Sequence, residues 1–164
     1  MTVSIVPLTS SDRQRLLKVD MAAFFFDPMA HPVDVATSHL DWSRTFGATR
    51  EGVDELVGVY TSYDMAVTAP GPSGALAQVP MAGLSWVSVH PDHRRRGVLT
   101  EMMTHHFARL HEEGCPLSGL HAAEVQIYGR FGYGISSVEQ ELELERGGVF
   151  TAPSLDAAAG RVTT

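Results

Sequence analysis

The fold is decided by residues 86–100, which read Trp86-Val87-Ser88-Val89-His90-Pro91-Asp92-His93-Arg94-Arg95-Arg96-Gly97-Val98-Leu99-Thr100. The residues that lead into this stretch, 81–89, carry no charge, which is typical of a strand in the middle of a sheet. A sharp turn at His90-Pro91 follows. After Gly97, apolar residues recur at three- and four-residue spacing as far as Leu110, which predicts a helix. The sequence therefore predicts a strand, a basic loop and a helix in succession.

This arrangement favours an anion-binding site at the start of the helix. The first N–H groups of a helix have no partner within it and carry a partial positive charge. Gly97 lets the backbone approach a ligand, and Arg94–Arg96 add formal charge, so a pyrophosphate is the expected guest. Taken alone, three adjacent arginines are more typical of a solvated loop. The stretch is neither a Walker loop nor a dinucleotide fingerprint.

Working outward, the remaining patterns predict an α/β (α+β) domain with a mixed sheet. Glycine, alanine and threonine become frequent after residue 146, so residues 1–146 are expected to form the domain and 147–164 a tail or linker. The expected strands cover residues 3–8, 57–68, 78–89, 117–120 and 136–145. The expected helices cover residues 13–25, 35–42, 98–113 and 124–131.

Composition narrows the class of protein. The 164 residues, 44% of them hydrophobic, suffice for one domain with its own core. The net charge of −7 argues against general binding to nucleic acid. There is no apolar run long enough for a membrane span, and the start does not read as a signal peptide. Cys115 is the single cysteine, so an internal disulfide is excluded and the expected location is cytoplasmic.

Two blocks resemble a known family. Residues 87–99 are similar to the acyl-CoA pyrophosphate loop of the GNAT superfamily of N-acetyltransferases, although Leu99 stands where the family has Gly or Ala. The second block, residues 121–134, contains Ile-Tyr-Gly-Arg-Phe-Gly-Tyr-Gly and resembles the Eis-like (enhanced intracellular survival) branch, through its N-terminal acetyltransferase domain. The resemblance implies a GNAT fold: a mixed, mostly antiparallel central sheet flanked by helices, with acyl-CoA between splayed central strands.

The resemblance also implies the activity and its cosubstrate. We expect an acetyl-CoA-dependent N-acetyltransferase that acts on a primary amine, either of an aminoglycoside-like polyamine or of a lysine. By resemblance, the backbone of Val87 and Val89 pairs with the pantetheine arm. The residues expected to bind acetyl-CoA are Val87, Ser88, Val89, Arg94, Arg95, Arg96, Gly97, Val98, Leu99 and Thr100.

Tyr128 is the predicted general acid. An amine that attacks a thioester expels a thiolate, which has to be protonated as it leaves. A tyrosine, with a reference pKa of about 10, holds its proton at neutral pH. In the family a tyrosine in this motif lies near the thiol of acyl-CoA. The alternative role for Tyr128 is that of a buried aromatic residue with a wet hydroxyl.

The acceptor pocket and the base are predicted from residue type. A cationic amine favours carboxylates and aromatic faces, which suggests Phe24, Asp27, Trp42, Trp86 and Glu124. Eis-like enzymes are expected to use the carboxylate of their own C-terminus, contributed by a further domain. This chain stops at Thr164, so either it is the N-terminal module of a longer protein or its base differs. Asp27 and Glu124 are the local carboxylates to test, and each equally suits a surface acid.

The remaining expectations concern metals and partners. The histidines do not show a zinc-binding spacing, so no metal is predicted. The expected partner is a small-molecule or lysine amine, with no nucleic acid and no membrane. Homo-oligomerisation stays open, because Eis-like relatives assemble as hexamers with help from later domains. The alternative function is an acyl-CoA-binding module that is inactive without further domains.

Overall fold

The computed structural model describes residues 2–25, 32–71 and 74–138. The chain divides into two units, Met1–Tyr133 and Gly134–Thr164, and the elements described below all belong to the first. Residues 136–138 have no regular secondary structure, so the predicted final strand does not begin there. Its remainder, the predicted tail and the candidate Asp27 lie outside the described residues.

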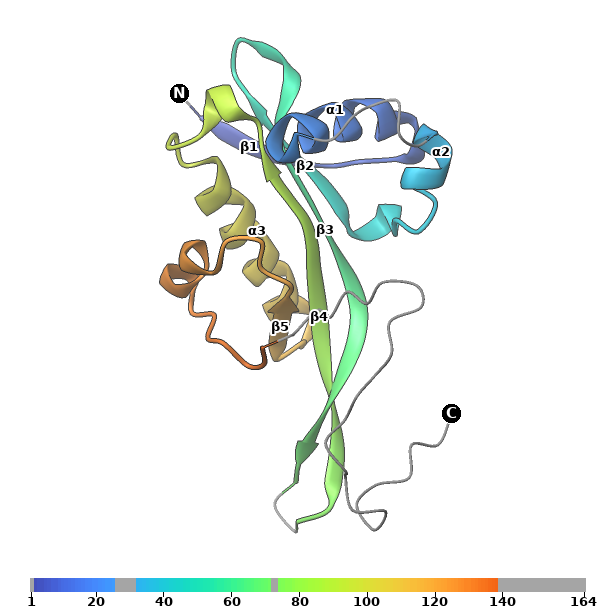
Figure 1. Cartoon of the computed structure of the whole chain (residues 1–164), viewed down its shortest axis with the longest axis vertical. Helices are drawn as coiled ribbons and strands as arrows, with labels where there is room; N and C mark the ends of the chain where they lie inside the picture. Colours follow the sequence, from blue (N-terminus) through green and yellow to red (C-terminus); the bar gives the residue numbers. More distant parts are fainter. Residues whose placement is uncertain (1, 26–31, 72–73, 139–164) are drawn as a thin grey trace, which may run out of the picture. The chain divides into compact units, whose positions relative to one another are not determined.

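Among the described residues, five strands form one sheet in the order β1-β2-β3-β4-β5 (Figure 1). Neighbouring strands are antiparallel except β4 and β5, which are parallel. The predicted mixed, mostly antiparallel sheet is therefore confirmed. The strands are β1 (Val3–Pro7), β2 (Thr45–Arg50), β3 (Val53–Pro70), β4 (Leu76–Val89) and β5 (Leu117–Leu120).

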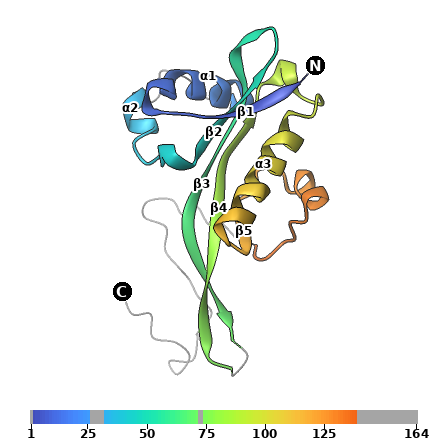
Figure 2. The same ribbon diagram turned by 180° about the vertical axis from the view of Figure 1, so that it is seen from behind.

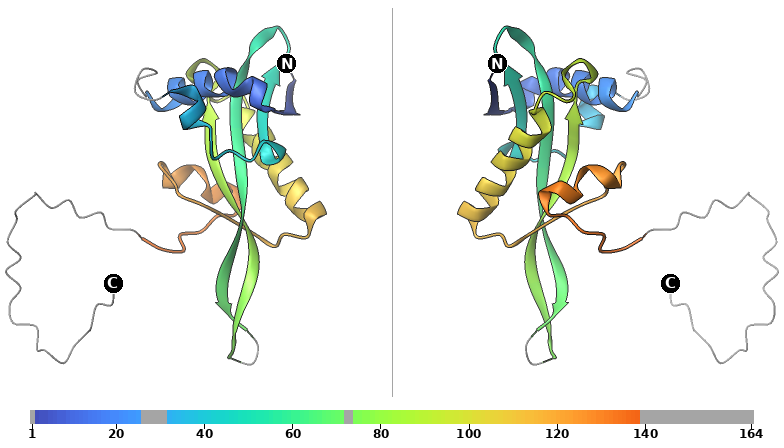
Figure 3. Two further views of the ribbon diagram at one scale, coloured as in Figure 1. Left: turned by 90° about the vertical axis from the view of Figure 1, so that its right-hand side faces the viewer. Right: turned by 90° about the vertical axis from the view of Figure 1, so that its left-hand side faces the viewer.

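The helices cover both faces of this sheet, with α1 and α3 on opposite sides (Figures 2 and 3). Met102 of α3 packs in one buried cluster with Tyr60 of β3, and Leu16 of α1 packs in a second cluster with Val59. Successive residues of a strand point to opposite faces, so β3 supplies both cores. The α-helices are α1 (Arg13–Phe24), α2 (Val33–Ala36) and α3 (Val98–Glu113). The 3-10 helices are η1 (Ser10–Asp12), η2 (Trp42–Arg44), η3 (Pro91–His93), η4 (Val125–Ile127) and η5 (Gly129–Phe131).

Helix α3 has the bounds that its apolar spacing predicts. Its buried residues recur every three or four positions, which places them on one face against the sheet. Gly114 ends the helix in the left-handed region, with φ at 67°, and its N–H bonds to the carbonyls of Leu110 and His111. The loop before α3 therefore lies between β4 and a helix that packs one buried face against the sheet. The buried residues of α3 are Val98, Met102, Met103, His106 and Leu110.

Strand β4 contains the irregularity that creates the site. Val59 of β3 pairs with Ser88, whereas Thr61 pairs with Ser85, so β4 carries an extra residue in a bulge. Trp86 lies in this bulge with φ at 54°. The pairing with β5 ends at Leu84, although β4 continues to Val89. Because β5 itself ends at Leu120, the last residues of β4 have no paired strand on that side among the described residues.

Three local expectations differ from the structure. Strand β2 was not predicted, because it carries Gly47 where a β-branched residue would signal a strand. A Cβ at Gly47 would lie 2.7 Å from Leu56 Cδ2, so the packing of Leu56 excludes a larger residue there. The predicted helix at 35–42 is wrong in its bounds, since α2 ends at Ala36 and η2 begins at Trp42. The predicted helix at 124–131 is two successive 3-10 turns, η4 and η5.

Candidate active site

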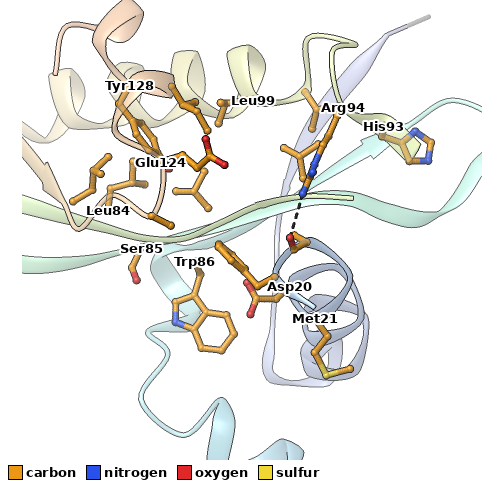
Figure 4. Close-up of a pocket in the computed structure, with 18 of the residues that line it drawn as sticks. Asp20, Met21, Leu84, Ser85, Trp86, His93, Arg94, Leu99, Glu124 and Tyr128 are labelled. Atoms are coloured by element: carbon orange, nitrogen blue, oxygen red, sulfur yellow. Dashed lines mark hydrogen bonds between the residues drawn. The ribbon is translucent and has the colours of Figure 1, made fainter. Parts of the chain in front are cut away.

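A cavity of about 1620 Å³ lies beside the end of β4, and Figure 4 shows some of the residues that line it. Its walls come from the end of β4, from the loop and first turn of α3, from the segment after β5, and from α1 with α2. Parts of the chain that are distant in sequence thus meet around one space. A cavity of this size is large enough for an extended ligand.

The end of β4 presents alternate side chains to this cavity. Val87 and Val89 line it, whereas Ser88 between them is 1% exposed and points to the side of α1. Because pairing with β5 has ended at Leu84, the backbone edge of this segment faces a gap that β5 does not fill. A ligand with amide groups can add to such an edge as a strand would.

The loop before α3 forms the basic end of the cavity. Arg94 and Arg95 line it, and Arg94 Nη2 also donates a hydrogen bond to the carbonyl of Ala23 at the end of α1 (3.2 Å). The first hydrogen bond of the helix runs from the N–H of Glu101 to the carbonyl of Gly97 (3.0 Å). The N–H groups of residues 98–100 therefore precede the helical ladder at the cavity wall.

Gly97 is required at this turn for its conformation. Its φ is 82°, in the left-handed region, and a Cβ built on it would meet nothing within 4 Å. No neighbouring protein atom among the described residues therefore requires a glycine at this position. The left-handed backbone conformation is the reason for glycine that the structure shows. Leu99 lines the cavity where the family pattern has Gly or Ala, and Arg96 is exposed outside the lining. The residues at this end still suit a pyrophosphate, because cationic groups and helical N–H groups converge on one space.

Tyr128 lines the cavity from the turn between η4 and η5. Burial raises the pKa of its phenol, so the hydroxyl keeps its proton at neutral pH. Among the described residues, this hydroxyl has no hydrogen-bond partner. Its ring meets that of Tyr133 edge to face, with centroids 5.8 Å apart. The geometry leaves Tyr128 with a proton available to a ligand.

A buried polar chain lies behind Tyr128. The Tyr133 hydroxyl lies 2.6 Å from Ser118 Oγ on β5, and Ser118 Oγ lies 2.9 Å from His106 Nε2 on α3. Burial lowers the pKa of His106 to about 4, so its ring is neutral at pH 7. Sequence reasoning considered His106 only as a metal ligand. Its place on the apolar face of α3 was the available signal for a buried role.

The structure brings together some of the predicted acceptor residues. Phe24, Trp86 and Glu124 line the cavity. Trp42 does not: it packs against the core cluster beneath α1. Asp27 lies outside the described residues.

Asp20 is a cavity residue that the sequence analysis missed. It is 8% exposed on α1, and its Oδ1 accepts a hydrogen bond from Ser88 Oγ at 2.5 Å. Burial raises the pKa of its carboxyl, and the hydrogen bond from Ser88 lowers it by less. The available signal was a carboxylate at helical spacing from Leu16 and Leu17, within an apolar face.

The described part of the chain was also searched for metal-binding groups and for membrane-spanning helices. There, no group of three or more His, Cys, Asp or Glu side chains is placed to hold a metal ion. None of the described helices combines the length and the apolar character that crossing a membrane requires.

The sequence is similar to those of curated N-acetyltransferases. The chain is 37% identical over 153 residues to the N-acetyltransferase Eis of Mycobacterium tuberculosis, which covers 89% of the chain and 36% of that relative. It is 48% identical over 84 residues to an uncharacterized N-acetyltransferase of Streptomyces avermitilis, which covers 51% of the chain and 20% of that relative. The chain spans about a third of the length, or less, of these curated relatives.

Solved structures share the fold. Eis1 from Mycobacterium abscessus matches with a TM-score of 0.67 and 33% identity, over 82% of this chain and 32% of that chain. A GCN5-related N-acetyltransferase from Kribbella flavida matches with a TM-score of 0.66 and 27% identity, over 80% of this chain and 33% of that chain. Residues 4–136 match the sequence model of the acetyltransferase (GNAT) domain, so the chain belongs to the GNAT acetyltransferase family. The predicted family and GNAT fold are confirmed.

Proposed function

We propose that this domain transfers the acetyl group of acetyl-CoA to a primary amine, either of an aminoglycoside-like polyamine or of a lysine side chain. The observation that carries the proposal is one cavity that joins the start of α3, the free edge of β4 and Tyr128. These three parts offer an anion cradle, a strand edge and a proton donor. Each of them matches one part of acetyl-CoA or of the acetyl transfer step.

Each part of the cosubstrate has a matching wall. Arg94, Arg95 and the N–H groups of residues 98–100 would hold the pyrophosphate. The backbone of Val87 and Val89 would pair with the amides of the pantetheine arm. Acetyl-CoA supplies an activated acyl carbon that an amine nitrogen can attack directly.

Tyr128 would then act on the leaving sulfur. Its proton is retained at neutral pH because burial raises the pKa of the phenol. A thiolate that forms in the cavity is a stronger proton acceptor than water, so proton donation by Tyr128 would assist cleavage of the C–S bond. The edge-to-face contact with Tyr133 would keep the Tyr128 ring in place.

The acceptor side suits a cationic amine. Glu124 supplies a carboxylate, and the rings of Phe24 and Trp86 supply apolar and cation–π surface. The net charge of −7 would also attract polyamines. The single Cys115 fits a reducing compartment, so we place the reaction in the cytoplasm.

A second candidate function rests on chain length. The N-acetyltransferase Eis of Mycobacterium tuberculosis is about three times as long as its matched segment, and a carboxylate from the rest of such a protein could serve as the base. The domain would then bind acyl-CoA without turnover on its own.

Calorimetry followed by a thiol-release assay separates these candidates. Acetyl-CoA is titrated into the chain, and free CoA thiol is then measured with aminoglycosides and a lysine peptide. Binding with turnover is the expected result. Binding without turnover would favour the second candidate, and a lack of binding would contradict both.

A further inference from the structure

The starting observation is a buried carboxylate that no cation neutralises in the part of the chain that the structure describes. Asp20 is 8% exposed and lies among core residues of α1. Within the described residues it forms no ion pair. Burial is the largest influence on the pKa of its carboxyl. A buried charge without a partner lowers stability, so such a position points to a functional role.

The two oxygens of this carboxylate are in different surroundings. Oδ1 accepts the hydrogen bond from Ser88 Oγ, and Ser88 is itself 1% exposed. Among the described residues, Oδ2 has no hydrogen-bond donor. Asp20 lines the cavity, as does Trp86, and Figure 4 draws both among the lining residues. Ser88 thus fixes the group and leaves one oxygen for a ligand.

The carboxylates of the cavity lining suit a cationic ligand, and the basic side chains of the same lining are Lys18, Arg94, Arg95 and Arg130. Asp20 and Glu124 are the two acidic side chains among the lining residues, and Glu124 is exposed whereas Asp20 is buried. Met21 and Trp86 add apolar surface to the lining of the same cavity. Ser88, which holds Asp20, lies between the two valines of β4 that line the acetyl-CoA side. A primary ammonium bound to Oδ2 would therefore lie in the same cavity as the activated acetyl group.

We propose that Asp20 binds the ammonium group of the acceptor and takes its first proton. This inference rests on the proposed function. In the step, an N–H bond of the ammonium breaks and its proton passes to Oδ2, which leaves a neutral amine. The nitrogen lone pair forms the C–N bond as the C–S bond breaks, and sulfur takes the proton of Tyr128. The second proton of the nitrogen restores Tyr128, and Asp20 releases its proton to water.

The groups packed around Asp20 are compatible with this role. Lys18 on the same helix is paired with Glu55 of β3 at 2.6 Å, and Arg94 donates to the carbonyl of Ala23. The described parts of α2, β3 and β4 place no charged group against Asp20, and Ser88 of β4 is its polar neighbour. Burial raises the pKa of Asp20, which brings it closer to the pKa of about 10 of a lysine-like amine. Proton transfer from ammonium to Asp20 is correspondingly less uphill.

The competing explanation is a structural tie between α1 and β4. Asp20→Asn separates the two, because an asparagine can still accept the hydrogen bond from Ser88 but has no charge and no basicity. A tie predicts nearly unchanged kinetics. The proposal predicts that kcat/KM falls at least a hundredfold, that the KM of the amine rises, and that thermal stability is equal or higher because a buried charge is gone.

The experiment compares four proteins: the unchanged chain, Asp20→Asn, Ser88→Ala and the exposed control Asp54→Asn. Calorimetry with acetyl-CoA and with a polyamine, thiol release across pH, and thermal melting are measured for each. Ser88→Ala keeps the carboxylate but removes the bond that lowers its pKa. Its acidic limb of kcat/KM should therefore shift to higher pH, a change that a structural role would not cause.

The outcomes separate the inference from the proposed function. Support requires unchanged acetyl-CoA affinity in all variants, and loss of kcat/KM with weaker polyamine binding in Asp20→Asn. It also requires an acidic limb shifted to higher pH in Ser88→Ala and no change in Asp54→Asn. Kinetics and polyamine affinity of Asp20→Asn within twofold of the unchanged chain would overturn the inference. If the unchanged chain binds acetyl-CoA without turnover, the proposed function fails. In that case, equal polyamine affinity of Asp20→Asn and the unchanged chain would overturn the inference as well. If Asp20→Asn does not fold, an unshifted acidic limb in Ser88→Ala would overturn it.

Discussion

At the scale of single residues, Tyr128 is the proposed proton donor to the leaving sulfur. Its hydroxyl faces the cavity, and burial holds the pKa of the phenol above its ordinary value. We expect Tyr128→Phe to lower kcat about a hundredfold and to leave the affinity for acetyl-CoA unchanged. Thiol release at saturating substrates measures the first quantity and calorimetry the second.

The matched control for this change is Tyr60→Phe. The hydroxyl of Tyr60 lies 2.6 Å from His105 Nδ1, and Tyr60 is not among the cavity-lining residues. Removing the hydroxyl should leave kcat unchanged and should lower the melting temperature, because the hydrogen bond to His105 is lost. Equal kcat values for Tyr128→Phe and the unchanged chain would return Tyr128 to a packing role.

Gly97 gives a second prediction at this scale. A non-glycine residue at φ 82° is strained by about 1–2 kcal/mol, and relief of that strain would move the N–H groups at the start of α3. We expect Gly97→Ala to weaken acetyl-CoA binding about tenfold. Gly97→Asn should weaken it less, because asparagine tolerates this conformation.

Gly52→Ala is the control for Gly97→Ala. Gly52 has a similar φ of 76° in a turn that does not line the cavity. It should lower stability without changing the affinity for acetyl-CoA. Equal effects of both alanine variants on affinity would contradict the assignment of Gly97 to the cradle.

At the scale of elements, the chain from His106 through Ser118 to Tyr133 connects α3, β5 and the segment after η5. His106 is 2% exposed, and burial lowers its pKa to about 4 from the ordinary value of 6.5. The native protein therefore holds His106 neutral, while the unfolded chain takes up a proton as pH falls below about 6.5. This stabilisation is present above that pH and is lost as pH falls toward 4.

We expect the unfolding free energy of the unchanged chain to fall between pH 7 and pH 4 by about 3 kcal/mol more than that of His106→Gln. Glutamine can still hydrogen-bond to Ser118 and does not titrate. Urea unfolding at a series of pH values measures the difference, and the exposed His111→Gln serves as the control. Parallel pH curves for the unchanged chain and His106→Gln would contradict the neutral, buried state of His106.

The same elements explain what could be predicted from sequence. The apolar spacing of α3 and the uncharged run of β4 depend on local burial, so both were found before the structure. Strand β2 was missed because it contains Gly47, which is not typical of a strand. Glycine is required there by the close packing of Leu56 from the neighbouring strand. Likewise the contact of Asp20 with Ser88 joins residues 68 positions apart. The basic end of the cavity follows from a local motif, whereas the position of Asp20 in its wall depends on contacts between distant elements.

At the scale of the whole molecule, charge is unevenly distributed. The chain carries a net charge of −7, yet three of its twelve basic residues are adjacent at the start of α3. The basic end of the cavity suits a phosphorylated ligand, while the remaining surface attracts cations. The two substrates of the proposed reaction would thus be drawn to the protein by opposite fields.

This distribution predicts a salt dependence that scales with the charge of the amine. Raising ionic strength from about 0.01 M to about 1 M shortens the Debye length from about 30 Å to about 3 Å. At saturating acetyl-CoA, kcat/KM for a polyamine should fall about tenfold or more over this range, because long-range attraction is screened. A monoamine of similar length should lose much less. Steady-state thiol release with both amines provides the measurement, and equal salt slopes would show that the net charge of the protein does not guide the acceptor.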